Sequence, residues 1–149
     1  MQTELEKSLN QRRERKIINY KEVAREIARI CWEKKGEDIV ILNLEGLSVV
    51  CDYFVIVTGD TEIQTRSISD AVMEKLEGSG ITLHHVEGYE DGKWILLDYE
   101  GVILHVFTPE IREYYDLERL WGDAEKEKWE PVESGKEDNQ SNSGSSPET

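Results

Sequence analysis

The most constraining feature of the sequence is a pair of apolar stretches, Lys93–Tyr99 and Val102–Phe107, separated only by Glu100 and Gly101. Apolar residues dominate both stretches, and a two-residue connection that contains glycine is typical of a tight hairpin turn. The pattern predicts two adjacent antiparallel strands. Any fold of this chain must therefore contain a β-sheet with this hairpin in it.

Helical and strand patterns alternate before the hairpin. Apolar residues recur every three or four positions over 20–35 and over 61–77, and a glycine ends each segment, which is typical of amphipathic helices. Short apolar runs at 39–44 and 52–58 predict strands covered on both faces. A weaker run at 81–86 predicts one more strand.

The residues after the hairpin predict helix again. Thr108 and Pro109 supply an N-cap and a first-turn proline for a short helix through Tyr115, and residues 117–121 add a last helical turn. Strands interleaved with helices, together with one antiparallel hairpin, predict an α/β fold with a single mixed β-sheet flanked by helices.

The two ends of the chain differ in composition from its middle. Residues 1–19 carry five basic and three acidic side chains, and we expect a flexible charged extension there. Residues 123–149 carry eight acidic and three basic side chains and few apolar ones, so they are expected to form a disordered acidic tail. One folded domain is expected over 20–122.

The charge of that domain limits its partners. Residues 20–122 hold ten basic and 21 acidic side chains, a net charge of −11. Nucleic-acid affinity comes largely from Lys and Arg that neutralise phosphates, so we expect little direct nucleic-acid binding by this core and favour a basic protein partner. No apolar run approaches the roughly 18 residues that cross a bilayer, and two cysteines are too few for a disulfide framework. The sequence predicts a cytoplasmic protein without a membrane segment.

Residues that could carry chemistry are present but poorly arranged. His84 and His85 are neighbours on a predicted strand and point to opposite faces, so they cannot readily share a metal ion. Asp52, Asp70 and Asp98 could form a magnesium-binding carboxylate cluster, but no two of them stand at Asp-x-Asp spacing on a strand. The sequence therefore predicts no metal, no cofactor and no catalytic residue.

Aromatic residues concentrate near the predicted hairpin. Six of the twelve Phe, Tyr and Trp residues fall within 94–121. Pleating of the strand places Trp94, Leu96 and Asp98 on one face of the sheet and the residues between them on the other. If no helix covers the first face, the exposed apolar patch marks a protein interface. The alternative is that helices cover both faces.

Several motifs in series resemble one known family, the ribosomal silencing factors (RsfS, also called Iojap). The resemblance spans about 20–123 and leaves 1–19 and 124–149 outside. It is carried by Cys51–Gly59, His85–Gly88, Trp94–Tyr99, His105–Phe107 and above all Tyr114–Asp123, with its Tyr-Asp-Leu-Glu-Arg-Leu-Trp sequence.

The resemblance implies a protein that binds the large ribosomal subunit, on the fourteenth large-subunit ribosomal protein, and sterically blocks joining of the small subunit. It also implies a fold similar to nucleotidyltransferases without their catalytic motif, so no enzyme is expected. From the aromatic stretch and the family motifs together, the expected partner-binding residues are Trp94, Leu96, Asp98, Tyr99, Tyr115, Asp116, Leu117, Arg119 and Trp121.

Two other hypotheses remain open at this level. One is a metal-dependent nucleotidyl or phosphoryl transferase that uses Asp52, Asp98 and Asp60, and it requires those carboxylates to converge. The other is a homodimer formed through the apolar patch.

Overall fold

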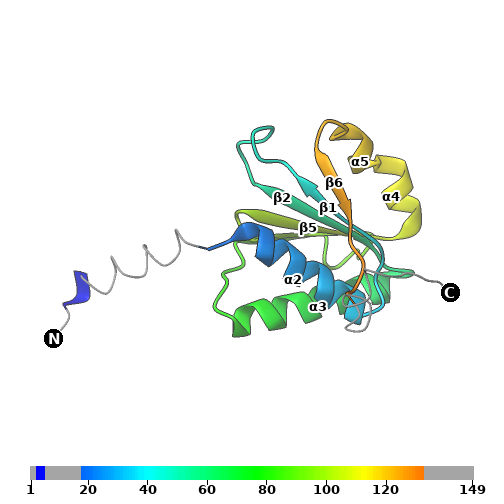
Figure 1. The fold of residues 1–149 in the computed structure, drawn as a ribbon. Coiled ribbons are helices and arrows are strands. Elements are labelled where there is room, and N and C mark those ends of the chain that lie inside the picture. The colour runs from blue at the N-terminus through cyan, green and yellow to red at the C-terminus, as the bar shows by residue number, and fades with distance from the viewer. Residues whose placement is uncertain (1–2, 6–17, 133–149) are drawn as a thin grey trace.

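The protein forms one six-stranded mixed sheet with helices on both of its faces (Figure 1). The computed structural model describes residues 3–5 and 18–132. None of the helices in these residues combines the length and the hydropathy of a membrane span. In chain order the elements are α2 (Tyr20–Glu33), β1 (Glu37–Asn43), β2 (Tyr53–Thr58), α3 (Glu62–Gly78), β3 (His85–Glu87), β4 (Trp94–Asp98), β5 (Val102–Phe107), α4 (Pro109–Tyr115), α5 (Leu117–Leu120) and β6 (Glu125–Lys128).

The strands lie in the order β3-β4-β5-β2-β1-β6. β2 and β5 are parallel, and every other neighbouring pair is antiparallel. The predicted hairpin is β4–β5, in which Trp94 pairs with Phe107 and Asp98 with Ile103. The predicted α/β class, a single mixed sheet flanked by helices, is confirmed.

The two long helices, α2 and α3, cover one face of the sheet (Figure 1). Each begins at a side-chain cap: Asn19 Oδ1 accepts a hydrogen bond from the Glu22 N–H, and Thr61 Oγ1 accepts one from the Gln64 N–H. The apolar sides of both helices pack on the inward residues of the strands to form the larger core. Its fully buried members include Ala24, Ile27, Ala28, Val55, Val57, Ile68, Val72, Leu76, Ile95, Leu97, Leu104 and Val106.

The opposite face carries a second, smaller core. The short helices α4 and α5 lie over part of this face, where α4 contacts β5 (Figure 1). The buried residues of this second core are Val40, Leu42, Leu44, Cys51, Ile56, Ile103 and Phe107. Because α4 and α5 together have only 11 residues, they cover only part of this face.

The strand predicted over 81–86 is shorter and later than expected. Only His85–Glu87 forms a strand, and 81–84 has no regular secondary structure. The reason is that the Ile81 N–H donates to the Leu76 carbonyl and closes the end of α3. Backbone pairing with β4 therefore begins only at His84, whose N–H donates to the Asp98 carbonyl.

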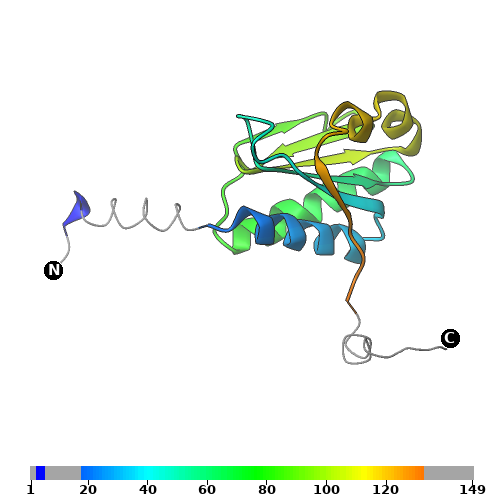
Figure 2. The same cartoon turned by 45° about the horizontal axis from the view of Figure 1, so that its top comes forward.

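The predicted start of the disordered tail at 123 is wrong for the segment that forms β6. This strand pairs with the edge of β1, with Val40 opposite Lys128 and Asn43 opposite Glu125. Figure 2 shows it running from the α5 side of the sheet past the end of α2. The free backbone edge of β1 supplies the hydrogen bonds, and Trp129 follows as an anchor. The expectations for 133–149, and for 1–2 and 6–17 of the predicted extension, lie outside the described residues.

Trp129 fixes the end of β6 against α2. Its backbone N–H donates to the Ile39 carbonyl at 2.9 Å, and its ring lies 6.5 Å from that of Trp32, centroid to centroid. Arg25 of α2 adds an ion pair with Glu127, at 3.3 Å. A predicted disordered segment is thus ordered by one aromatic contact and a backbone ladder, neither of which its composition reveals.

Candidate functional site

The face of the sheet opposite α2 and α3 is the candidate site. Trp94, Leu96 and Asp98 of β4 point to it and are half-buried, whereas Ile95 and Leu97 between them are fully buried in the larger core. We call this surface the aromatic face and define it by Trp94, Leu96, Asp98, Tyr115, Leu117 and Trp121. The long helices α2 and α3 cover only the opposite side of β4, so the side chains of β4 on this face remain in partial contact with water.

Aromatic rings meet where α4 ends against β4. The ring of Tyr115 lies 4.8 Å from Trp94, and Phe107 lies 4.9 Å from Trp94 on the other strand of the hairpin. Tyr114 contacts Tyr115 edge-on at 5.0 Å. Tyr114 is 79% exposed and Tyr115 is 50% exposed, so this cluster extends from the second core to the protein surface. Such geometry suits an aromatic contact with another macromolecule.

A buried histidine lies beneath the cluster. The Trp94 Nε1–H donates to His105 Nδ1 at 3.1 Å, and the ring of Phe54 lies 4.4 Å from the imidazole. Burial lowers the pKa of His105 to about 3, since a charged imidazole cannot be solvated among these rings. The imidazole is therefore neutral near pH 7.

The corner between α4 and α5 is held to the sheet by Arg112. Its guanidinium donates to the Asp38 carbonyl at 2.6 Å, to Thr58 Oγ1 at 2.8 Å and to Glu118 at 2.7 Å. Asp116 turns the chain between the two helices in a left-handed conformation, with φ 50° and ψ 57°. Sequence reasoning overlooked Arg112, because nothing local distinguishes it from a solvated helix residue.

The structure brings most of the predicted partner-binding residues to one side of the sheet. Leu117 and Trp121 pack against the second core, and Trp121 also contacts Phe54. Arg119 is exposed, and so is its neighbour Leu120, at 73%, which the prediction left out. The separation of four residues between Leu117 and Trp121 places both on one side of the helical turn.

Tyr99 is the member of the predicted set that the structure removes from this face. It is only 3% exposed and belongs to the larger core beneath α2 and α3. It follows Asp98 in the strand, so pleating directs its side chain away from the aromatic face. Burial raises the pKa of its hydroxyl to about 12. A direct contact between Tyr99 and a partner is therefore ruled out by its position.

Asp98 has a structural partner as well as an exposed side. Its Oδ1 accepts a hydrogen bond from the Glu100 N–H at 2.8 Å, within the hairpin turn. Glu100 occupies a left-handed conformation there, with φ 80°. Across the sheet Asp98 pairs with His85, which lies 2.7 Å from Glu87. The rim of the aromatic face along β3 and β4 is thus charged.

The carboxylates that a transferase would need do not converge. Asp52 directly precedes β2 and Asp60 follows its far end, so the six-residue strand separates them by about 20 Å at roughly 3.3 Å per residue. Across residues 3–5 and 18–132, no three His, Cys, Asp or Glu side chains are placed to hold a metal ion. The arrangement gives the transferase hypothesis no support.

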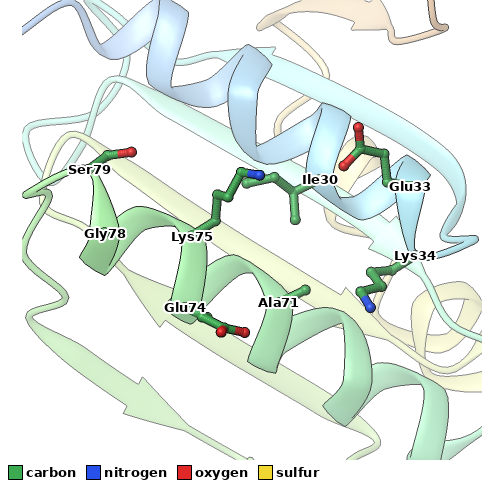
Figure 3. Close-up of a pocket in the computed structure, with 8 residues that line it drawn as sticks. All are labelled: Ile30, Glu33, Lys34, Ala71, Glu74, Lys75, Gly78 and Ser79. Carbon is green, nitrogen blue, oxygen red and sulfur yellow. The ribbon is translucent and has the colours of Figure 1, made fainter.

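A groove with a volume of about 560 Å³ lies between α2 and α3 on the helix side. Figure 3 shows Lys75 of α3 reaching across it toward Ile30 of α2, while Lys34 and Glu74 lie along its lower side. Its charged side chains alternate in sign and are ordinary solvated helix residues. Nothing in the groove pairs an acid with a base for catalysis.

Comparisons with known proteins converge on one family. The family model described as "Ribosomal silencing factor during starvation" matches residues 17–149. A Bacillus subtilis protein named ribosomal silencing factor RsfS is 38% identical over 107 residues, which cover 72% of this chain and 91% of that protein. Its counterpart in Halalkalibacterium halodurans is 41% identical over 92 residues, covering 62% and 79%. A crystal structure of a Chromobacterium violaceum protein superposes with a TM-score of 0.69 at 30% identity, covering 77% of this chain and 92% of that one.

Proposed function

The chain belongs to the ribosomal silencing factor family, and on that premise we propose that it binds the large ribosomal subunit and prevents the small subunit from joining. The proposed contact is the fourteenth large-subunit ribosomal protein, and the proposed binding surface is the aromatic face. Translation in the cytoplasm would be repressed by steric exclusion, without any chemical step.

The observation that carries this proposal is the position of Trp94. Its ring is half-buried on an incompletely covered sheet face, with Phe107 on one side and Tyr115 on the other. A tryptophan supported by packed rings loses little conformational freedom when a partner covers it, and such residues dominate binding energy at protein interfaces. Exposed Tyr114 and Leu120 lie around one surface hollow with Tyr115 and extend the apolar area on that side.

Electrostatics support a basic protein as the partner. The net charge of −11 over 20–122 attracts a basic surface and repels exposed phosphate groups. Charge of one sign speeds encounter with an oppositely charged partner and disfavours wrong ones. A basic ribosomal protein exposed on the large subunit fits this charge better than bare ribosomal RNA does.

Sedimentation with separated ribosomal subunits tests the proposal. The protein should pellet with large subunits and not with small ones, and it should reduce the joining of the two. Trp94→Ala should fold normally and lose about 30-fold in affinity, which corresponds to about 2 kcal/mol for an interface hot spot. Ile63→Ala is the control, because Ile63 of α3 is 75% exposed on the far, helix-covered side.

Wild-type affinity in a folded Trp94→Ala protein would exclude the aromatic face as the binding surface. Failure of the wild-type protein to pellet with large subunits would exclude the proposed function itself.

A homodimer through the aromatic face is the second candidate, and the exposed Tyr114, Tyr115 and Leu120 favour it. Dimerisation and ribosome binding would then compete for one surface. Sedimentation velocity over a range of protein concentrations tests this directly. A dimer that Trp94→Ala dissociates would support it, whereas a monomer at every concentration would exclude it.

A further inference from the structure

Trp94 is held by two different kinds of contact. Its ring lies against Phe107 and Tyr115, and its indole N–H donates to His105 Nδ1 at 3.1 Å. Ring contacts favour offset and edge-to-face arrangements, but they do not by themselves specify which edge of the indole carries the N–H. The hydrogen bond selects one orientation of the indole, since its N–H has a single direction and a half-buried donor needs an acceptor.

His105 is well suited to act as that acceptor. It is 4% exposed and lies edge-on to Phe54 at 4.4 Å and stacked on Phe107 at 6.0 Å, so its ring cannot turn easily. Because Nδ1 accepts, the proton of the neutral imidazole is on Nε2. Burial keeps the imidazole neutral by lowering its pKa to about 3.

The other ring nitrogen argues that packing alone does not explain this residue. Among the described residues, His105 Nε2 is buried without a hydrogen-bond partner. A leucine or phenylalanine at this position would fill the second core without leaving a buried N–H unsatisfied, which is unfavourable for folding. The imidazole contributes one thing that an apolar side chain cannot, namely the acceptor for Trp94.

We propose that His105 is the positioning residue of the aromatic face: its Nδ1 fixes the orientation in which Trp94 meets the partner protein. This inference rests on the proposed function, because it concerns the same surface. His105 itself does not touch the partner, and it acts through the tryptophan.

Four variants test the inference in the full-length chain. His105→Leu removes the acceptor, and His105→Asn keeps an acceptor oxygen near the position of Nδ1. Trp94→Phe removes the donor but keeps an aromatic ring, and the double variant Trp94→Phe/His105→Leu completes a cycle. Affinity for purified large subunits is measured by sedimentation at several protein concentrations, and the folding of each variant is checked by urea unfolding.

The expected result is coupling between the two residues. His105→Leu and Trp94→Phe should each weaken large-subunit binding about five-fold, the loss expected for one hydrogen bond. The double variant should be no weaker than either single variant, and His105→Asn should stay within about two-fold of the wild type. Additive losses, or wild-type binding by a folded His105→Leu, would overturn the inference.

A second readout does not depend on the ribosome. In ¹⁵N-labelled protein, the indole N–H of Trp94 should exchange slowly with solvent in the wild type and in His105→Asn, and rapidly in His105→Leu. Unchanged exchange in His105→Leu would overturn the inference even if that variant bound poorly. If His105→Leu fails to fold, Trp94→Phe and His105→Asn carry the binding test.

The outcomes separate this inference from the proposed function. Loss of binding in Trp94→Ala together with unchanged binding in Trp94→Phe and His105→Leu would leave the function intact and overturn the positioning role. Absence of large-subunit binding by the wild type would overturn the function and with it any role of His105 in that binding.

Discussion

Arg112 on α4 and Glu118 on α5 form an ion pair, with 2.7 Å between Nη2 and Oε2, and only 12% and 20% of the two side chains is exposed. The same guanidinium donates to the carbonyl oxygen of Asp38 and to the hydroxyl of Thr58, on the sheet. One side chain therefore joins both short helices to the strands beneath them. The position of Tyr115 over Trp94 depends on this corner.

Arg112→Ala should lower the free energy of unfolding by about 2 kcal/mol or more, because it leaves a partly buried carboxylate and two acceptors without their donor. It should also weaken large-subunit binding, since Tyr115 loses its support. Arg119→Ala is the matched control: Arg119 is exposed, and its removal should change stability by less than about 0.5 kcal/mol. Urea denaturation measures the stability of both variants. Equal stability of the two variants would contradict the role assigned to Arg112.

Two truncations should behave differently. Removal of 133–149 should leave the melting temperature unchanged, because that segment is polar and acidic in composition. Removal of 125–149 should lower the melting temperature by several degrees, because it also deletes β6 and the Trp129 contact with Trp32. Differential scanning calorimetry provides the comparison, and identical melting temperatures would show that β6 contributes nothing to stability.

The free energy of unfolding should decrease as the pH is lowered, because His105 binds a proton more readily in the unfolded chain. Its pKa is near 6.5 in the unfolded chain and about 3 in the folded protein, so between these values the unfolded state binds the extra proton. The stabilisation is fully present above pH 6.5 and is lost progressively as the pH falls toward 3. Between pH 7 and pH 5 the loss should be about 2 kcal/mol.

His105→Asn is the control for this pH dependence, because asparagine does not titrate. The exposed His84 and His85 are present in both proteins and cancel in the comparison. As the pH falls, the wild type should therefore lose more unfolding free energy than the variant does. Parallel stability curves from pH 7 to pH 5 would show that His105 becomes protonated in the folded protein.

Two substitutions separate the roles of Asp98. Asp98→Asn removes the charge and retains an oxygen that can accept from the Glu100 N–H, whereas Asp98→Ala removes both. With a basic partner, Asp98→Asn should weaken binding a few-fold at low salt, and the difference from wild type should shrink as salt screens the lost attraction. Only Asp98→Ala should also lower stability. A loss of affinity in Asp98→Asn that is independent of salt would exclude the electrostatic role.

Local sequence patterns were sufficient for most of the sheet. Glu100 and Gly101 set the length of the β4–β5 turn, and the alternation from Trp94 to Asp98 correctly assigned side chains to the two faces. The largest failure, β6, depended on a contact between distant segments. β6 forms because the edge of β1, more than 80 residues earlier, accepts it, and the acidic composition of the segment gives no sign of that pairing.

The sequence was sufficient to predict Trp94 as a residue of the candidate site, but not Arg112 and His105, which hold the site in place. Trp94 stands out because tryptophan on a strand face is conspicuous in a sequence. Arg112 and His105 do not, because their importance lies in partners 74 and 11 residues away, Asp38 and Trp94. Tyr99 was included because it is aromatic and near Trp94, although the same pleating argument places it on the other face.

The two outer strands of the sheet bear on how this protein behaves at high concentration. β6 alternates glutamate and lysine along its whole length, and its four residues are all exposed. β3, at the opposite edge, has only three residues. A short or densely charged outer strand is a poor template for a strand from another molecule, because pairing would bury charge for few hydrogen bonds. The two edge strands thus disfavour edge-to-edge pairing between molecules. The aromatic face can therefore remain apolar without adding to aggregation through the sheet edges.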